Sequence, residues 1–237
     1  MLRYYANPLR DPDGAFEREV RSVAEQLNLT GSGIMICLGG DGTLLRAAKE
    51  SAKLAIPVLG INYGDVGFLS AFGRDKLRAG LTAIARGAYE TGNCPLLRYE
   101  TDSGLSGLAF NELVLHRGAA ALPLRLSAEI PGRGQLRYLG DGLIIATPIG
   151  STAYSQNSGG PVIDTGVNAL LLTPVCCGMP PRVVSDDSRI TITVTGDVAA
   201  LLSADGETLP ELLHPGESVR LFKAAEFVQL IRLREQL

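Results

Sequence analysis

The first part of the chain alternates between two patterns of apolar residues. Apolar positions recur at helical spacing over 16–27, 44–48 and 77–85, whereas 34–38 and 56–61 are short continuous apolar runs. The helical spacing predicts amphipathic helices, and the continuous runs are typical of strands buried on both faces of a parallel sheet. The order of strands and helices therefore predicts an open α/β sheet.

The second part of the chain follows a period of two. Apolar residues alternate over 124–130, and similar strand patterns cover 135–139, 189–194 and 198–204. Such alternation places one face of each strand against a core and the other in solvent. Gly196-Asp197 has the composition of a hairpin turn, so we expect it to join the last two of these strands. The pattern predicts a mainly antiparallel β structure.

These patterns divide the chain into two domains. We expect an α/β domain over 1–92, joined again by 222–237, and a β-rich domain over 93–221. In the second domain a long helix is expected only near 151–173. The apolar stretch 227–231 predicts a final strand or a final helix that returns to the first domain, and the pattern leaves both open.

Composition excludes several classes of protein. The 237 residues carry 22 Lys+Arg against 25 Asp+Glu, which gives no electrostatic case for a nucleic-acid partner. No run of about 20 apolar residues could span a bilayer, and the first residues lack the apolar core of a signal peptide. The cysteines lack metal-site spacing and predict free thiols in a reducing compartment; they are Cys37, Cys94, Cys176 and Cys177. We therefore expect a cytoplasmic protein with no nucleic-acid or membrane partner.

A glycine-rich loop follows the first continuous apolar run and reads Gly39-Gly40-Asp41-Gly42-Thr43. Ligands of open α/β sheets bind at such strand ends. The glycines let backbone N–H groups face an anion, and we expect Thr43 to cap the next helix, whose N-terminus favours phosphate. Asp41 either holds magnesium or accepts a proton from a hydroxyl nucleophile, and a simple Asp-Gly turn is the structural alternative. The spacing matches neither the Walker P-loop nor the dinucleotide fingerprint.

A second polar segment, 138–161, concentrates Gly, Ser, Thr and Pro between apolar runs. Ser151 and Thr152 follow a Pro-containing turn and can cap a helix whose N–H groups bind a polar ligand. Tyr154 offers a ring for stacking on a flat heterocycle. Asn111-Glu112 lies between two other apolar runs, where a strand end or bulge would let both side chains serve a cleft, for example on vicinal ribose hydroxyls. A satisfied buried Asn is the alternative reading of that pair.

Together these motifs resemble those of the NAD kinases in order and spacing, over nearly the whole chain. The loop around Asp41 is shared with phosphofructokinases and with diacylglycerol and sphingosine kinases, whereas the segment ending at Tyr154 is far more specific. The resemblance implies an N-terminal α/β open-sheet domain and a mainly antiparallel β C-terminal domain that binds NAD. The matching motifs are Tyr5-Ala-Asn-Pro8, Gly39-Gly-Asp-Gly-Thr43, Gly60-Ile-Asn-Tyr-Gly64, Gly67-Phe-Leu69, Asn111-Glu112, Asp141-Gly-Leu143, Thr147-Pro-Ile-Gly-Ser-Thr-Ala-Tyr154, Gly159-Gly-Pro161 and Asp205-Gly206.

The resemblance also implies residue roles. Asp41 resembles the general base for the 2′-hydroxyl of the adenosine ribose of NAD, with Gly42 contacting the same ligand. Phe68 resembles an aromatic residue near the adenine. Asn111 and Glu112 resemble the NAD-binding pair of the second domain. The phosphates of the donor are expected at the other residues of the glycine-rich loop, Gly39, Gly40 and Thr43.

Further roles follow in the second domain. Asp141 resembles a carboxylate that meets the nicotinamide half of NAD, often across a subunit interface, which implies a homodimer or homotetramer with a shared site. Cys176 matches a position used through its backbone. The adenine and neighbouring pocket would be lined by Thr152, Ala153, Tyr154 and Asn157. No metal ligand can be named.

Three positions depart from the family pattern. Leu139 stands where the family usually carries a basic side chain, two residues before Asp141, although Arg137 is near in sequence. Asn157 replaces a common Ser and should still hydrogen-bond. Glu207 replaces a frequent Gln, which changes a donor to an acceptor.

The implied activity is phosphorylation of NAD to NADP. ATP, another triphosphate or polyphosphate would supply the phosphoryl group, and Mg²⁺ or another divalent cation would neutralise charge. Two alternatives stay open: a non-catalytic NAD(P)-binding sensor with the same motifs, and a lipid kinase of the same superfamily. The lipid kinase would need an apolar or membrane-facing surface, whereas the chain has no Trp and 5% aromatic residues.

Overall fold

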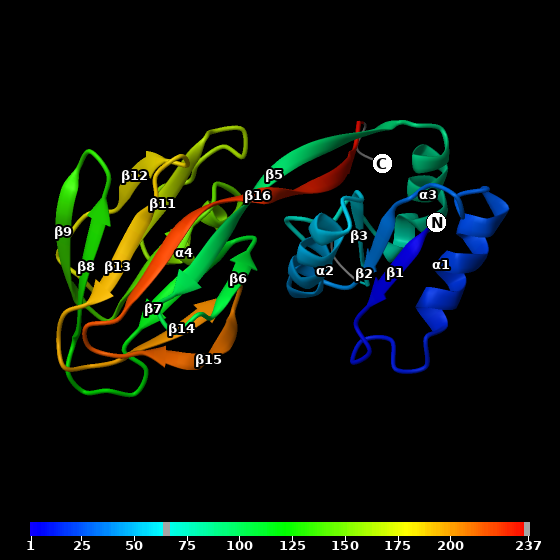
Figure 1. Ribbon diagram of the computed structural model, residues 1–237. Helices are drawn as coiled ribbons and strands as arrows, with labels where there is room; N and C mark the ends of the chain where they lie inside the picture. The colour runs from blue at the N-terminus through cyan, green and yellow to red at the C-terminus, as the bar shows by residue number, and fades with distance from the viewer. Residues whose placement is uncertain (64–66, 235–237) are drawn as a thin grey trace. The chain divides into compact units, whose positions relative to one another are not determined.

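The computed structural model describes residues 1–63 and 67–234 (Figure 1). Gly64 of the motif named above and residues 235–237 of the expected returning segment lie outside the described residues. The chain forms two compact units, one comprising Met1–Cys94 and the chain from Glu226 onward, the other comprising Pro95–Ala225. The fold class predicted from the pattern, an α/β unit followed by a mainly antiparallel β unit, is confirmed.

The first unit is built on a parallel sheet. Its strands β1 (Arg3–Ala6), β2 (Met35–Leu38) and β3 (Val58–Asn62) lie in that order, and the short β4 (Phe72–Gly73) pairs with β3. The last strand of the chain, β16 (Ser218–Leu233), pairs with β3 in parallel, with Leu230 opposite Val58. The stretch 227–231 is therefore a strand that returns to the first unit.

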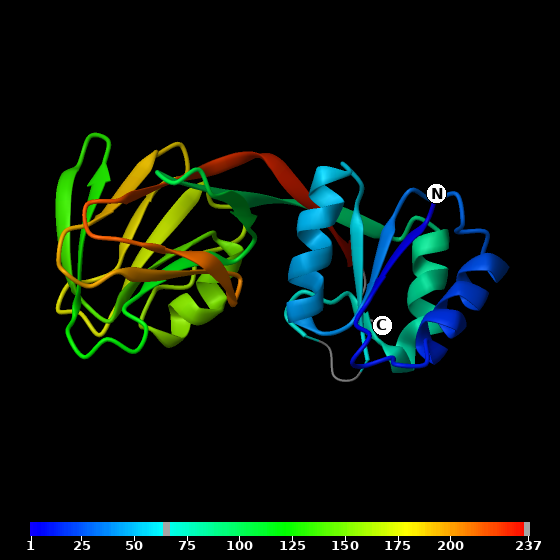
Figure 2. The same cartoon turned by 60° about the horizontal axis from the view of Figure 1, so that its bottom comes forward.

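Helices cover both faces of this sheet (Figure 2). Helix α1 (Ala15–Gln26) contacts α3 (Leu77–Ala85), which follows the short turn η1 (Arg74–Lys76), and both bury apolar side chains against the sheet. Helix α2 (Asp41–Lys53) lies on the opposite face, against β2 and β3. The apolar residues that recur at helical spacing in α1 and α3 form the face of each helix that is buried against the sheet.

The predicted cap of α2 is wrong. The helix begins at Asp41 with Gly40 as its N-cap, and no side chain caps it. Thr43 lies inside the first turn, and its hydroxyl accepts a hydrogen bond from Asn7 Nδ2 at 3.2 Å. Because the helix starts three residues earlier than expected, Asp41 itself occupies the positive end of the helix dipole.

The second unit is a pair of packed β-sheets. One sheet has the order β12-β11-β10-β7-β14-β15, and β16-β13-β8-β9 forms the other, with β6 pairing with β5. Apolar residues from both sheets form one core cluster. The strands that build this unit are β5 (Tyr89–Thr101), β6 (Ser106–Ala109), β7 (Glu112–His116), β8 (Leu124–Ile130), β9 (Gly134–Gly140), β10 (Gly142–Ala146), β11 (Ala169–Val175), β12 (Arg182–Ser185), β13 (Ile190–Val194), β14 (Ala200–Ala204), β15 (Glu207–Leu213) and the first part of β16.

Two local predictions fail in this unit. Gly196-Asp197 does not form a hairpin, because β13 pairs with β8 and β16 whereas β14 pairs with β7 and β15 in the other sheet. The long helix expected near 151–173 is replaced by the turn η2 (Ile149–Thr152) and the short α4 (Tyr154–Asn157). Gly159, at a φ of 86°, and the following Pro161 prevent the helix from continuing.

Candidate active site

The carboxylate of Asp41 is held by the loop that follows β3. Its Oδ2 accepts a hydrogen bond from the backbone N–H of Phe68 at 3.0 Å, and its Oδ1 accepts one from the N–H of Leu69 at 3.2 Å. Gly67 packs directly on this carboxylate, and a Cβ atom there would overlap it. Each carboxylate oxygen keeps lone pairs beyond these bonds. The backbone therefore orients the Asp41 carboxylate, which can still accept a hydrogen bond from a further donor.

Glycines flank the start of α2. A Cβ on Gly39 would overlap the side chain of Thr43, whereas Gly40 and Gly42 face open space. The first-turn N–H groups of a helix lack intrahelical acceptors and point toward the positive end of the dipole. The structure gathers Gly39, Gly40, Asp41, Gly42 and Thr43 at this helix end, where the N–H groups of Gly39 and Thr43 already donate to the carbonyls of Ile61 and Gly40. The Phe68 ring in the adjoining loop is 81% exposed.

The Asn111-Glu112 pair lies at a break between two strands of the second unit. Asn111 follows β6, and Glu112 begins β7. The Asp205 carboxylate, in the turn between β14 and β15, accepts hydrogen bonds from the N–H groups of Phe110 at 3.0 Å and Asn111 at 2.8 Å. Asp205 adopts a φ of 51°, and its own N–H donates to the Glu112 carbonyl. This reciprocal contact fixes the backbone at the break.

Glu112 is a buried acid with unmet hydrogen-bonding capacity. Its side chain is 5% exposed, and among the described residues its Oε2 has no hydrogen-bond partner. Burial raises its pKa to about 7, and the nearby charge of Asp205 adds to the shift. A buried acceptor of this kind favours a ligand that brings a hydroxyl donor.

The polar segment around η2 is anchored beside this pair. Thr147 Oγ1 donates to the Phe110 carbonyl at 2.6 Å, and the Thr147 N–H donates to the Asn111 carbonyl at 2.8 Å. Gly150 packs so closely on Asn111 that a Cβ would overlap its backbone. The structure thereby brings Asn111 and Glu112 next to the segment that carries Thr152, Ala153, Tyr154 and Asn157. Tyr154 is 41% exposed.

Asp141 and Cys176 lie at the opposite end of β10. The register places Glu112 opposite Ala146 at one end and Val175 opposite Gly142 at the other. At a rise of about 3.3 Å per residue, the strand separates these ends by about 13 Å. Asp141 and Cys176 are thus not brought together with Glu112 within this unit.

Asp141 has its own cationic partner, which the sequence reading missed. Its Oδ1 accepts a hydrogen bond from Arg117 Nε at 2.6 Å, and this contact lowers the pKa of Asp141. A hydrogen bond with Asp141 raises the pKa of the Cys176 thiol, and Cys176 adopts a φ of 48°. No motif signals Arg117, which follows β7 and is 24 residues from Asp141.

Asp205 is followed by a glycine, and this pair indicates a tight turn. The hydrogen bond between the Asn111 N–H and Asp205 spans 94 positions in sequence, and no local pattern indicates it. Of the positions that depart from the family pattern, Leu139 is 50% exposed on β9, and Asn157 ends α4. Glu207 begins β15, two residues after Asp205.

The described residues provide neither a preformed metal cage nor a membrane span. Within residues 1–63 and 67–234, no three His, Cys, Asp or Glu side chains gather as metal ligands. In that same part of the chain no helix is both long enough and apolar enough to cross a membrane.

Comparison with known proteins identifies the family. Residues 7–89 match the ATP-NAD kinase N-terminal domain, and residues 110–233 match the ATP-NAD kinase C-terminal domain. The NAD kinase of Geotalea daltonii is 34% identical over 213 residues, which cover 86% of this chain and 74% of the relative. The NAD kinase of Symbiobacterium thermophilum is 39% identical over 210 residues, covering 84% and 73%.

Two solved structures share the fold. Yeast NADH kinase, complexed with NADH, superposes with a TM-score of 0.82 at 23% identity, covering 98% of this chain and 82% of that one. An NAD kinase from Archaeoglobus fulgidus, in complex with ATP, gives a TM-score of 0.78 at 24% identity, covering 98% and 93%. With both domain models matched along the chain, this protein belongs to the NAD kinase family of phosphotransferases.

Proposed function

We propose that the chain phosphorylates the 2′-hydroxyl of the adenosine ribose of NAD, with ATP or another phosphate donor, and that Asp41 is the general base. The observation that carries this proposal is the orientation of the Asp41 carboxylate by the N–H groups of Phe68 and Leu69. Family membership supplies the reaction class. The local geometry supports the choice of base.

In the proposed reaction, the sugar hydroxyl donates its proton to Asp41 as the oxygen attacks the transferred phosphoryl group. A positioned base contributes a rate factor of roughly 10²–10⁴. The amides of Gly40 and Gly42 would hold the donor's phosphates at the N-terminus of α2, with Gly39 and Thr43 beside them. Positioning and charge neutralisation dominate phosphoryl transfer, so this loop needs no covalent intermediate.

A divalent ion fits this site without a protein cage. Mg²⁺ usually keeps several waters and is bound largely through substrate phosphates, so the ion would lie on the donor bound at this loop while Asp41 serves as the base. When bound, the ion would neutralise charge on the donor's phosphates. The protein's own part is to present the amides of Gly40 and Gly42 and to keep Asp41 oriented.

We assign NAD binding in the second unit to the cluster around Glu112. Its buried Oε2 would accept a ribose hydroxyl, and Asn111 would contact the same sugar. Thr152, Ala153 and Asn157, with the half-exposed Tyr154 ring, would line the adenine pocket. Phe68 would serve the adenine from the loop beside Asp41.

The placement of Asp141 supports a shared site. Asp141 precedes Gly142, at the end of β10 that lies about 13 Å from the end beside Glu112. It would meet the nicotinamide half of an NAD bound by a second subunit, together with the backbone of Cys176. We therefore propose a homodimer or homotetramer. In a symmetric dimer each subunit would complete the other's site.

A reducing, cytoplasmic setting is part of the proposal. All four cysteines are free, and Cys37 and Cys94 are buried. Burial raises the pKa of the Cys37 thiol to about 12, so it stays protonated at neutral pH.

The test is a coupled assay with purified protein. NAD or NADH is combined with ATP or polyphosphate, with Mg²⁺, and NADP or NADPH formation is followed; a chelator arm tests the metal. Turnover that requires the metal supports the proposal. Tight binding of NAD with no product in any arm would favour a non-catalytic NAD(P)-binding sensor.

A further inference from the structure

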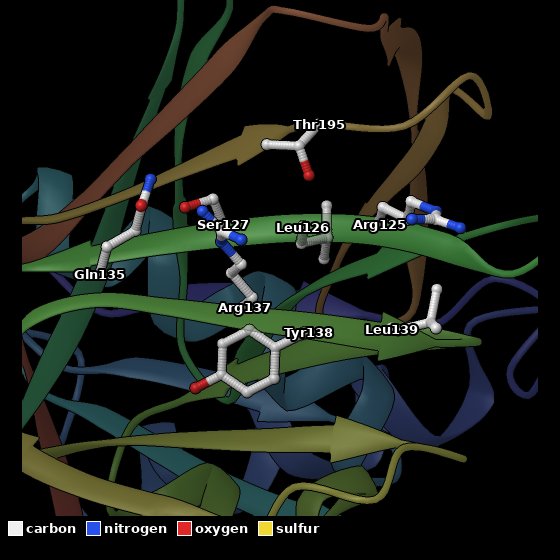
Figure 3. Close-up of a pocket in the computed structure, with 8 residues that line it drawn as sticks. All are labelled: Arg125, Leu126, Ser127, Gln135, Arg137, Tyr138, Leu139 and Thr195. Atoms are coloured by element: carbon white, nitrogen blue, oxygen red, sulfur yellow. The ribbon is translucent and has the colours of Figure 1, made fainter.

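A cavity of about 360 Å³ opens in the second unit, and none of the residues that line it belongs to the cluster around Glu112 (Figure 3). It lies over β8 and β9, at the end of β13. The side chains that matter for its chemistry are Arg125, Ser127, Gln135, Arg137, Leu139 and Thr195. Its volume lies at the lower end of the range for small-molecule sites.

Two arginines share this face. Arg125 is opposite Leu139, and Ser127 is opposite Arg137, so the two arginines are diagonal neighbours across β8 and β9. Diagonal pairs in a sheet are about 7–8 Å apart, within reach of long side chains. Figure 3 shows Arg137 reaching from β9 toward Ser127, with the Thr195 hydroxyl pointing toward β8.

Neither arginine is neutralised. Within residues 1–63 and 67–234, Arg125 and Arg137 form no ion pair, although Glu129 lies on the same face of β8. Other arginines of this unit are paired: Arg117 with Asp141 and Arg220 with Asp102. Two unpaired positive charges that line one cavity, with their guanidiniums on either side of Leu126 in Figure 3, create a local positive potential that favours an anion.

The stem of one of these arginines has a close neighbour. Gly196 packs on the aliphatic part of Arg125, and a Cβ atom at Gly196 would come within 2.9 Å of Arg125 Cβ. The cavity is also lined by Ser127 and Thr195, which carry hydroxyls, and by Gln135, which carries an amide. Guanidinium forks bind phosphate bidentately, and the hydroxyl and amide donors can serve its remaining oxygens.

We propose that this cavity is a second anion site that binds a di- or triphosphate group. Phosphate chains offer more acceptor oxygens and more charge than a single carboxylate, so they fit two separate guanidiniums with three neutral donors. The group can come from inorganic polyphosphate or from a nucleotide. None of the residues assigned to NAD or to the phosphate donor belongs to this cavity.

The test follows leucine methyl resonances by NMR in the full chain, at about 0.15 M salt to suppress nonspecific attraction. Leu139 lines the cavity, and Leu44 in α2 reports separately on the proposed donor loop. Wild type, an Arg125→Ala/Arg137→Ala double variant and Arg133→Ala are titrated with tripolyphosphate, ATP and inorganic sulfate. Arg133 is the matched control, because it lies in the turn between β8 and β9 outside the cavity.

The expected result is a saturable shift of the Leu139 methyls with tripolyphosphate. It should persist in Arg133→Ala and weaken by about tenfold or more in the double variant, since two charge-assisted contacts are lost. A matching ATP response identifies nucleotides as a source, and a response to tripolyphosphate alone identifies inorganic chains. The proposal is overturned if Leu139 does not respond, if the double variant responds like wild type, or if sulfate at equal concentration gives the same shift.

Discussion

Gly67 touches the carboxylate of Asp41, and no larger residue fits between the loop after β3 and the start of α2. The contact matters because the next two N–H groups along the loop, those of Phe68 and Leu69, hold the same carboxylate. The orientation of the proposed base thus depends on a glycine 26 residues away in sequence.

A Gly67→Ala substitution should displace that carboxylate. Misplacing a reacting group by about 1 Å can cost about 10²-fold in rate, so we expect kcat to fall by this order while the protein stays folded. Steady-state kinetics and a thermal melt measure both effects. Gly31→Ala is the matched control, because Gly31 belongs to the same unit and faces open space. Equal kcat values for the two variants would contradict the proposed dependence.

An Asp41→Asn substitution should retain the fold and NAD binding but lose most turnover. The amide cannot take the proton, and the rate should fall by roughly 10²–10⁴. Asn has one acceptor oxygen, so one backbone hydrogen bond is lost at a cost of about 1 kcal/mol in stability. Initial rates of NADP formation and calorimetric titration with NAD separate these effects. Turnover within tenfold of wild type would remove Asp41 from the role of base.

Glu112 should make the stability of the protein depend on pH. Its pKa in the folded chain, about 7, lies above the ordinary value of 4.5. The folded state therefore binds the proton more tightly, and stability falls as pH rises from about 4.5 to about 7, by about 3 kcal/mol at most. Urea unfolding of wild type and Glu112→Gln across pH 4–8 measures this. The difference in unfolding free energy between the two proteins should change in favour of the variant as pH rises. A difference that does not change with pH would show that Glu112 has its ordinary pKa.

A shared site predicts complementation between subunits. Asp41→Asn and Asp141→Asn proteins should each be poorly active, whereas co-expressed subunits should form hybrids in which some sites keep both carboxylates. For a randomly mixed symmetric dimer, about a quarter of wild-type activity returns. Rates are measured on the co-purified mixture, with each variant alone as control. If the mixture is no more active than its components, Asp141 does not act across an interface.

Local sequence pattern predicted most elements because each depends on neighbours in the chain. The spacing of apolar residues from Phe16 onward places α1, and the continuous run ending at Leu38 places β2 and the glycine-rich loop after it. The alternation over Leu124–Ile130 places β8. In each case the pattern of buried apolar positions fixes the element.

Pairing between distant segments could not be predicted. Thr193 of β13 lies opposite Ser127, and Ser203 of β14 lies opposite Val114, so consecutive strands enter different sheets although a turn sequence separates them. The same limit applies to the candidate site. The hydrogen-bond partners of Asp41 and Asn111 are 27 and 94 residues away in sequence. The partner of Asp141 belongs to no motif.

The pairing of Leu230 with Val58 has a consequence for synthesis of the protein. The edge of the parallel sheet beside Val58 is completed by residues that are synthesised only after the whole second unit. Until then, the nascent N-terminal half must keep that strand edge unpaired while the whole β-rich half is translated. Chain elongation, and not only local folding, therefore sets when the proposed phosphate loop gains its finished scaffold.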